Sequence, residues 1–300
     1  MMENSLASTT RKQYSTALNS WLLFCNENNV LAFNPKASEL LQCLYQQFEL
    51  GASYGTLNSL RSAVSVISES KIGDHPDVCR FLKGVFRSRP PRPRYNATWD
   101  ANVVLDFLEK QLSDELDIAS LTYKTVTLVA LASAQRTQTI ASIRTSNLIW
   151  SPSDVKIKIS DLIKTSRPGS AQPLLVFPYF AARPELCVPS LIKLYMEKTK
   201  DIRQCDKLFV SPRSPHKAVG APSIGRWIKN TLSRSGVDTT IFSAHSVRHA
   251  ASSKAKTRGA DINIIFNTAG WSASSRVFAQ FYQRPILKDT APFANFVLNN

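Results

Sequence analysis

The sequence predicts a mainly α protein of two domains, of which the first is all helical and the second is α-rich with a small antiparallel β-sheet. A length of 300 residues is enough for two domains of ordinary size, and 43% hydrophobic residues allow each of them to bury a core. Apolar residues recur at steps of three and four along most of the chain, which is typical of amphipathic helices. Three short segments, 155–160, 173–178 and 207–210, are the strand candidates.

The first domain is predicted to cover residues 1–90. Its first helix carries Tyr14, Leu18 and Trp21 on one face and follows several Ser and Thr residues that can cap it. The segments after it repeat the same spacing with Leu, Val and Phe. The predicted helices of this domain are 8–28, 38–50, 53–69 and 76–88.

A basic linker is predicted at 91–98, because the surrounding sequence RSRPPRPRYNATW contains too much proline to continue a helix. From residue 80 to residue 94 there are six basic side chains and no acidic one. A solvated linker or a targeting signal would also have this composition. In so basic a chain we expect these side chains to contact nucleic-acid phosphates, and the DNA-binding residues predicted here are Lys83, Arg87, Arg89, Arg92 and Arg94.

The second domain is predicted to cover residues 99–300. Its segment LTYKTVTLVALASA, within a helix at 116–134, is apolar enough to be a central buried helix. VKIKIS and PLLVFP are strand candidates that form a small hairpin or a three-stranded sheet, and KLFV at 207–210 is a further short strand. The other predicted helices are 100–112, 137–144, 188–200, 222–234, 244–257, 260–267 and 275–283.

The charge of the chain points to a polyanionic partner. Lys and Arg number 37 against 22 Asp and Glu, which gives a net charge of +15 and favours nucleic acid. No apolar stretch is long enough to span a membrane, and the first residues lack the apolar block of a signal peptide, so we expect the protein inside the cell and, in a eukaryote, in the nucleus. The five scattered cysteines are expected to be reduced thiols.

The densest group of functional side chains is HSVRHAASSKAKTRG at 245–259. On a helix, His245, Arg248 and His249 share a face. Two histidines at this spacing could bind zinc, but Ser246 occupies the place of the glutamate in the usual motif and no third ligand is evident, so no metal is expected. A helix with two histidines in ordinary polar contacts is the other interpretation.

Four more side chains lie at places where function is plausible. Arg136 directly follows the buried helix, where a cation needs a partner or an anion, and Lys164 lies where a strand meets a turn. Trp271 follows a helix-ending glycine, and Tyr282 lies on the last predicted helix. Taken singly, each has an ordinary explanation as an ion pair, a solvated lysine or a core aromatic residue.

Taken in chain order, these residues resemble the active site of the tyrosine recombinases, the phage-integrase-like enzymes that break and join DNA. The most specific element is HSVRHAASS, which resembles the family's H-x-L-R-H-x-x-A-(S/T) box. The ending GW…FAQFYQRP has Trp where many members have His, and is closer to recombinases of eukaryotic mobile elements such as DIRS-like retrotransposons. The resemblance covers most of the chain: residues 1–90 resemble the core-binding domain and 99–300 the catalytic domain.

The resemblance implies a site-specific recombinase or integrase that serves a mobile element. Arg136 and Arg248 would hold one phosphate, and Tyr282 would attack the phosphorus to form a 3′-phosphotyrosyl bond. Because this bond conserves the energy of the phosphodiester, neither ATP nor a metal is required. The implied partner is double-stranded DNA, clasped between the two domains of each subunit of a homotetramer on paired sites, and the tail 283–300 would pack against a neighbour.

The remaining site residues would move protons or close the pocket. The resemblance implies that His245 accepts the tyrosine proton, Lys164 protonates the departing 5′ oxygen and Trp271 donates its N–H to a phosphate oxygen. His249 would have a supporting role. No cofactor is implied.

The chain departs from the family pattern at Thr139, where many members have an acidic residue that braces the first arginine. Gln135 or Gln138 could assist Arg136 instead. The lysine is assigned less firmly, because Lys156 and Lys158 lie on the adjacent strand. Two alternatives therefore stay open: a domesticated DNA-binding protein that has lost strand exchange, and a monomeric nicking-closing enzyme like the type IB topoisomerases.

Overall fold

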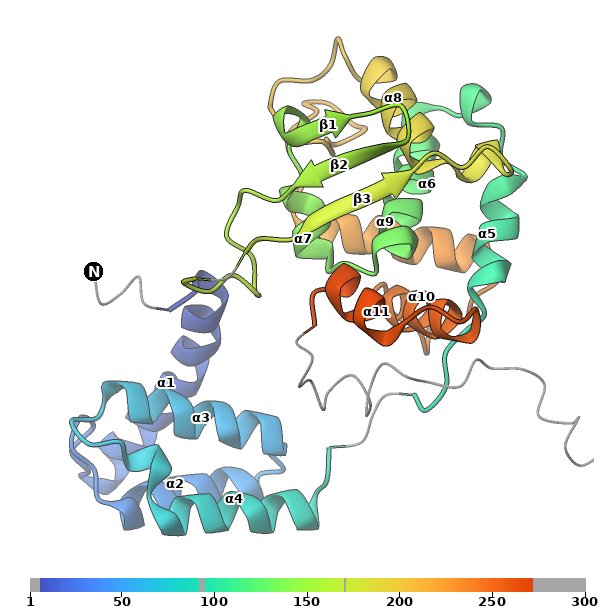
Figure 1. The fold of residues 1–300 in the computed structure, drawn as a ribbon. Helices are drawn as coiled ribbons and strands as arrows, with labels where there is room; N and C mark the ends of the chain where they lie inside the picture. Colours follow the sequence, from blue (N-terminus) through green and yellow to red (C-terminus); the bar gives the residue numbers. More distant parts are fainter. Residues whose placement is uncertain (1–5, 92–94, 170, 272–300) are drawn as a thin grey trace, which may run out of the picture. The chain divides into compact units, whose positions relative to one another are not determined.

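The computed structural model describes residues 6–91, 95–169 and 171–271. The chain divides into two compact units, residues 1–93 and 94–300, which are shown in Figure 1. Each unit has a hydrophobic core of its own. No helix within the described residues has the length and apolar character that crossing a membrane requires. All five cysteines are unpaired thiols, as predicted.

The first unit contains four α-helices in its described part: α1 (Ser8–Asn28), α2 (Ala37–Glu49), α3 (Tyr54–Ile67) and α4 (Pro76–Ser88). Their bounds agree with the predicted helices to within two residues, because local signals set the ends. Asn29 takes a left-handed backbone that stops α1, Ser53 accepts the Thr56 N–H at the start of α3, and Pro76 begins α4. Trp21 is fully buried in this core and its indole donates to the Ala32 carbonyl at 3.0 Å.

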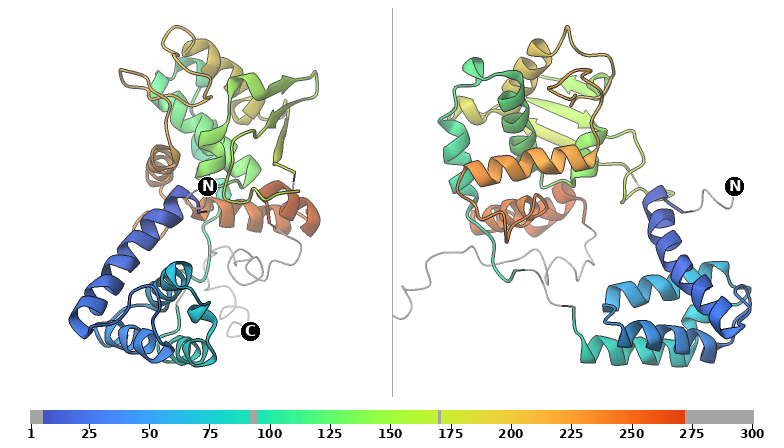
Figure 2. Two further views of the ribbon diagram at one scale, coloured as in Figure 1. Left: turned by 90° about the vertical axis from the view of Figure 1, so that its left-hand side faces the viewer. Right: turned by 180° about the vertical axis from the view of Figure 1, so that it is seen from behind.

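The second unit is built around α6 (Ile118–Ser133), the apolar helix that the sequence predicts to be central. A three-stranded antiparallel sheet of β1 (Leu148–Trp150), β2 (Asp154–Lys158) and β3 (Leu174–Pro178) lies on one side of α6. Helix α9 (Ala221–Arg234) lies on the other side, as the two views of Figure 2 show. The further helices are α5 (Ala101–Glu109), α7 (Thr137–Ser142), α8 (Val188–Lys198), α10 (Ser246–Thr257) and α11 (Ile262–Ala269).

The sheet confirms the predicted hairpin and adds a strand that the sequence did not indicate. Val155 pairs with Phe177 and Ile157 with Leu175, so their buried side chains face the core while Lys156 and Lys158 face outward. Strand β1 has only three residues, too few to show an alternating pattern.

The predicted strand at 207–210 is wrong. Lys207 and Val210 form only isolated bridges, with Arg144 and Ala218 respectively. Leu208, Phe209 and Val210 are all buried, so this segment is a continuous apolar connection through the core. The predicted helix at 275–283 lies outside the described residues.

Candidate active site

Arg136 lies at a sharp break between α6 and α7. Helix α6 ends because Ala134 adopts a left-handed backbone with φ of 49°, while its N–H bonds to the Ala130 carbonyl. A left-handed backbone is strained for any residue with a β-carbon, by about 1–2 kcal/mol. Arg136 then occupies the N-cap position of α7, and its half-buried side chain makes no capping hydrogen bond. Within the described residues this side chain has no hydrogen bond or ion pair, so its guanidinium is available to an anion.

The two glutamines that flank Arg136 bind other elements. The Gln135 side chain is buried and donates from Nε2 to the Thr268 carbonyl at the end of α11, at 2.6 Å. Gln138 Oε1 accepts the backbone N–H of Lys164 at 3.2 Å. The described contacts therefore link the residues beside Arg136 to two other parts of the site. Thr139, which replaces the usual acidic residue, is buried.

Arg248 is buried between α10 and the end of α11. Only 2% of the residue is exposed, and its Nη2 donates to the Ala269 carbonyl at 3.1 Å. Its guanidinium carbon lies 4.8 Å from the centre of the Trp271 ring, in a cation–π contact. Gly270 makes this possible, because its left-handed backbone (φ of 69°) ends α11 and brings the chain round to Trp271.

His245 feels the charges of three other predicted site residues. It lies at the N-cap of α10 and its pKa is lowered to about 4. Desolvation by the surrounding protein is the largest cause, followed by the positive charges of Arg248, Arg136 and Lys164. The residue keeps exposed surface, so the protein crowds the ring without enclosing it. Its lowered pKa keeps the imidazole neutral at pH 7, the form that accepts a proton.

His249 packs between His245 and Tyr95. Only 5% of the residue is exposed, and its ring centre lies 5.6 Å from that of His245 and 5.4 Å from that of Tyr95. Close by, the Trp99 indole donates to Ser246 Oγ at 2.8 Å. Tyr95 lies within the predicted linker 91–98, and its contact with His249 belongs to the second unit.

Lys164 lies on the loop between β2 and β3 with an exposed side chain. Three residues earlier, Asp161 accepts from Arg144 Nε at 2.9 Å and forms an ion pair with Lys207. This ion-pair group was not found from the sequence. Arg144 lies 17 residues from Asp161 in the sequence and Lys207 lies 46 residues from it, and no local pattern marks such long-range pairs.

Comparison with known proteins identifies the family. Residues 101–285, more than half of the chain, match the model described as the phage integrase family. The chain belongs to the phage integrase family. No curated protein matches its sequence.

Solved structures of site-specific recombinases and integrases share the fold of this integrase-family chain at low sequence identity. XerH site-specific recombinase bound to difH substrate matches with a TM-score of 0.58 and 14% identity, over 90% of this chain and 76% of that one. The Tn1549 transposon integrase in complex with circular intermediate DNA matches with a TM-score of 0.57 and 12% identity, over 90% of this chain and 87% of that one. A lambda integrase tetramer bound to a Holliday junction matches with a TM-score of 0.53 and 13% identity, over 95% of this chain and 74% of that one. The mainly α fold class predicted from the sequence is thereby confirmed.

The basic residues predicted to bind DNA in this integrase-family chain have different surroundings. Lys83 and Arg87 are exposed one turn apart on α4, where they line a groove between α3 and α4. Arg89 stacks its guanidinium 3.8 Å from the centre of the Phe48 ring and donates to the Phe48 carbonyl at 2.7 Å, so it also holds α4 against α2. Arg92, Arg94 and Tyr282 lie outside the described residues.

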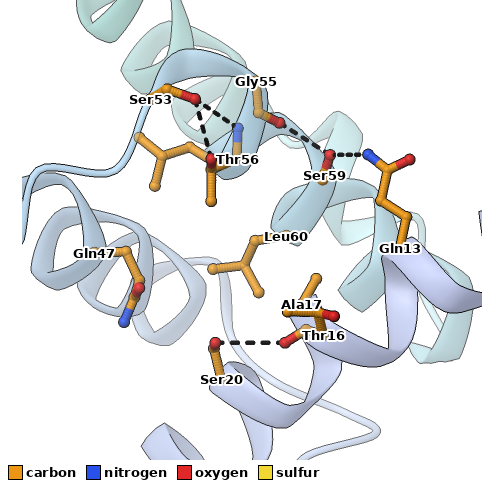
Figure 3. Close-up of a pocket in the computed structure, with 11 residues that line it drawn as sticks. Gln13, Thr16, Ala17, Ser20, Gln47, Ser53, Gly55, Thr56, Ser59 and Leu60 are labelled. Carbon is orange, nitrogen blue, oxygen red and sulfur yellow. Dashed lines mark hydrogen bonds between the residues drawn. The ribbon is translucent and has the colours of Figure 1, made fainter. Parts of the chain in front are cut away.

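A second groove lies between α1 and α3, with Gln47 of α2 at its edge (Figure 3). It has a volume of about 540 Å³ and its lining contains no charged side chain. Gln13 on α1 donates to Ser59 on α3 at 2.6 Å, and Thr56 contacts Ser53 at 3.0 Å. Sequence reasoning missed this groove, because neutral Ser, Thr and Gln residues on helices give no distinctive signal.

Proposed function

We propose that this chain is a site-specific DNA recombinase that breaks and rejoins DNA through a covalent 3′-phosphotyrosyl intermediate. The observation that carries the proposal is the pair of hydrogen bonds beside Arg136 in a member of the phage integrase family: one joins Gln138 to Lys164, and the other joins Gln135 to the end of α11, which also binds Arg248. The positive charges of these three cations also act on His245. Concentrated positive charge beside a neutral histidine suits phosphoryl transfer, which requires stabilised phosphate oxygens and a proton acceptor.

The two arginines would bind the scissile phosphate. Each guanidinium can donate two parallel hydrogen bonds to the non-bridging oxygens, where charge accumulates during the reaction. Arg248 is already fixed by Ala269, whereas Arg136 is held through its backbone at the start of α7. Trp271 packs on Arg248 and would offer its indole N–H to the same phosphate.

Cleavage is a balanced exchange of two bonds. The Tyr282 oxygen forms a bond to phosphorus, and the bond from phosphorus to the 5′ oxygen breaks with its electron pair on that oxygen. The tyrosine proton passes to His245, and a proton from the Lys164 ammonium goes to the 5′ oxygen. The bound phosphate is anionic and would raise the pKa of His245 from its low value in the free protein, which makes the ring a better acceptor. Rejoining reverses these steps, so the reaction needs neither ATP nor a metal.

The partner and the assembly follow from the same comparison. The similar proteins were solved with DNA, as a tetramer on a Holliday junction in the case of lambda integrase. We infer that this chain binds duplex DNA, acts as a homotetramer on paired sites and serves a mobile genetic element, as the transposon integrase does. The tail 283–300, outside the described residues, would pack against a neighbouring subunit.

The two grooves of the first unit would bind different parts of the DNA, one the phosphates and the other the base edges. Lys83 and Arg87 can neutralise backbone phosphates, which gives affinity without reading sequence. The neutral groove offers amide and hydroxyl groups of the kind that bond to base edges, with Gln13 as a candidate for adenine.

The test is covalent trapping on DNA. Wild-type protein is incubated with suicide duplexes that carry sequences flanking its own gene, and the products are separated by denaturing electrophoresis. We expect a slowly migrating protein–DNA species that Tyr282→Phe abolishes, while DNA affinity stays within a few-fold because only one hydroxyl is removed. Undiminished trapping by the variant would mean another nucleophile. DNA binding without any covalent species would favour a domesticated binder, and relaxation of supercoiled DNA by a monomer without sequence preference would favour a topoisomerase.

A further inference from the structure

The loop that carries Lys164 is fastened at several points. A lysine side chain has four rotatable carbons, so its amine reaches a fixed place often only if its backbone is held. Lys164 is exposed, and the loop that carries it joins β2 to β3. The fixation therefore has to come from the residues around it.

Two anchors hold the loop to its own unit on the side before Lys164. Asp161 is bound by Arg144 and by Lys207. Ile163 is buried in the core, and its N–H donates to Ser166 Oγ at 2.9 Å. Both anchors fix the base of the loop, and neither reaches the helix start that presents Arg136.

A third anchor does reach it. The Lys164 N–H donates to Gln138 Oε1 at 3.2 Å, and Gln138 lies on α7 only two residues after Arg136. This hydrogen bond links the backbone of the lysine to the short helix whose first residues position the arginine. Lys207, which binds Asp161, contacts α7 only at its last residue, through the Ser142 carbonyl at 3.3 Å, so the Gln138 hydrogen bond is the described contact that joins Lys164 itself to the start of α7.

We propose that Gln138 is a positioning residue that sets the Lys164 amine against the phosphate held by Arg136. This inference rests on the proposed function, because it concerns the proton that Lys164 gives to the 5′ oxygen. Gln138 itself touches no reacting atom and acts through the backbone of Lys164.

A neutral amide suits this place. A carboxylate at residue 138 would also accept the backbone N–H, but its charge would attract both the Lys164 ammonium and the Arg136 guanidinium. The cations would then pair with the protein instead of with the phosphate. Gln138 accepts the hydrogen bond and leaves the positive charge of the site undiminished.

The leaving group of the DNA provides a specific test. In one suicide duplex the bridging atom at the scissile phosphate is the natural 5′ oxygen, and in a second duplex it is sulfur. A thiol has a pKa of about 8.5 against about 16 for water or an alcohol, so sulfur leaves as a thiolate without a donated proton. Both duplexes have the base sequence that the wild-type protein selects from a randomised library. Single-turnover cleavage of the two duplexes separates proton donation from every other step.

We expect Lys164→Ala to cleave the oxygen duplex far more slowly than wild type and to recover on the sulfur duplex. Gln138→Ala should show the same pattern in weaker form, with a loss of roughly 10- to 100-fold on oxygen and wild-type rates on sulfur, because misplacement of a catalytic group by about 1 Å has effects of this size. Melting temperature and DNA affinity should change little.

Two matched controls accompany these variants. Gln172→Ala removes an amide that bonds to Ser166 in the same loop but not to α7, and should cleave both duplexes at the wild-type rate. Gln135→Ala removes the glutamine that holds the end of α11, and should slow both duplexes equally, since it acts on the side of Arg248 and Trp271.

Three results would overturn the assignment. Equal slowing of Gln138→Ala on both duplexes would mean a general structural role, and unchanged rates on both would mean none. Failure of sulfur to restore Lys164→Ala would remove the lysine as proton donor and the positioning role with it. Absence of a covalent species with wild-type protein on either duplex would instead contradict the proposed function itself.

Discussion

Arg248 and the backbone of Lys164 in the second unit are held by hydrogen bonds, whereas Lys83 and Arg87 on the α3–α4 groove of the first unit are not. Arg248 is buried and bonded to Ala269, and the Lys164 backbone is held by Gln138. Lys83 and Arg87, in contrast, project into solvent, and the described residues offer them no hydrogen bond or ion pair. Both groups attract phosphate, but only the exposed side chains have to be ordered when the DNA binds.

This difference separates residues that should determine the cleavage rate from residues that should determine the DNA affinity. Charges fixed before the DNA arrives need no reorganisation during the reaction, so they stabilise the transition state effectively. Exposed lysine and arginine side chains adapt to the backbone of any sequence and release counterions, which strengthens binding in a salt-dependent way. We therefore expect substitutions in the two regions to affect different measured quantities.

The largest effect is expected from Arg248→Ala. Removing one preorganised charge donor should slow single-turnover cleavage by about 10²–10³-fold at saturating DNA, equivalent to about 2.7–4 kcal/mol. DNA affinity should change much less. Arg258→Ala removes an equal charge at the exposed end of the same helix and serves as the control, with a rate close to wild type. Wild-type cleavage by Arg248→Ala would refute the site.

A smaller effect, on binding alone, is expected from the double variant Lys83→Ala/Arg87→Ala. Loss of two phosphate contacts should weaken binding about tenfold at low salt and reduce the slope of log affinity against log salt by about two. Cleavage at saturating DNA should be unchanged. Titrations at several salt concentrations measure both quantities, with Lys71→Ala as an exposed control from the same unit. An unaltered salt slope would show that the groove does not contact phosphate.

The smallest effect concerns His245 and the stability of the free protein in acid. Its folded pKa of about 4 lies below the ordinary value of 6.5. Above pH 6.5 the ring is neutral in both states and contributes nothing. As the pH falls from 6.5 to 4 the unfolded chain takes up a proton that the folded protein does not, so the fold loses stability in this window.

His245→Gln should remove that loss. Denaturant unfolding between pH 7 and pH 4 measures the free energy of unfolding of both proteins. The curve of the variant is expected to fall less steeply through this range than that of wild type. Parallel curves would mean that the cations around His245 do not lower its pKa.

The sequence predicted most of the fold because local signals define its helices. Caps and breaks such as Ser53, Pro76 and Gly270 lie where the helices begin and end. The exceptions have physical causes. Strand β1 is too short for a periodic pattern, and the apolar run at 207–210 is buried without joining the sheet.

Within the site, residues close in sequence were easier to predict than partners far apart. The spacing of His245 and Arg248 follows directly from helix geometry. The hydrogen bond from Lys164 to Gln138 spans 26 residues and that from Gln135 to Thr268 spans 133, so only the folded chain shows them. The sequence suggested that these glutamines assist Arg136 directly, whereas their described contacts hold the loop and the helix on either side of it.

The most direct test of the proposed chemistry is to identify the bond between protein and DNA. The covalent species is digested with protease and nuclease, and the linked peptide is sequenced by mass spectrometry. The proposal predicts a peptide in which Tyr282 carries a nucleotide through its 3′ phosphate, with a free 5′ hydroxyl left on the other DNA end. A linkage through a 5′ phosphate, or through any residue other than Tyr282, would contradict it.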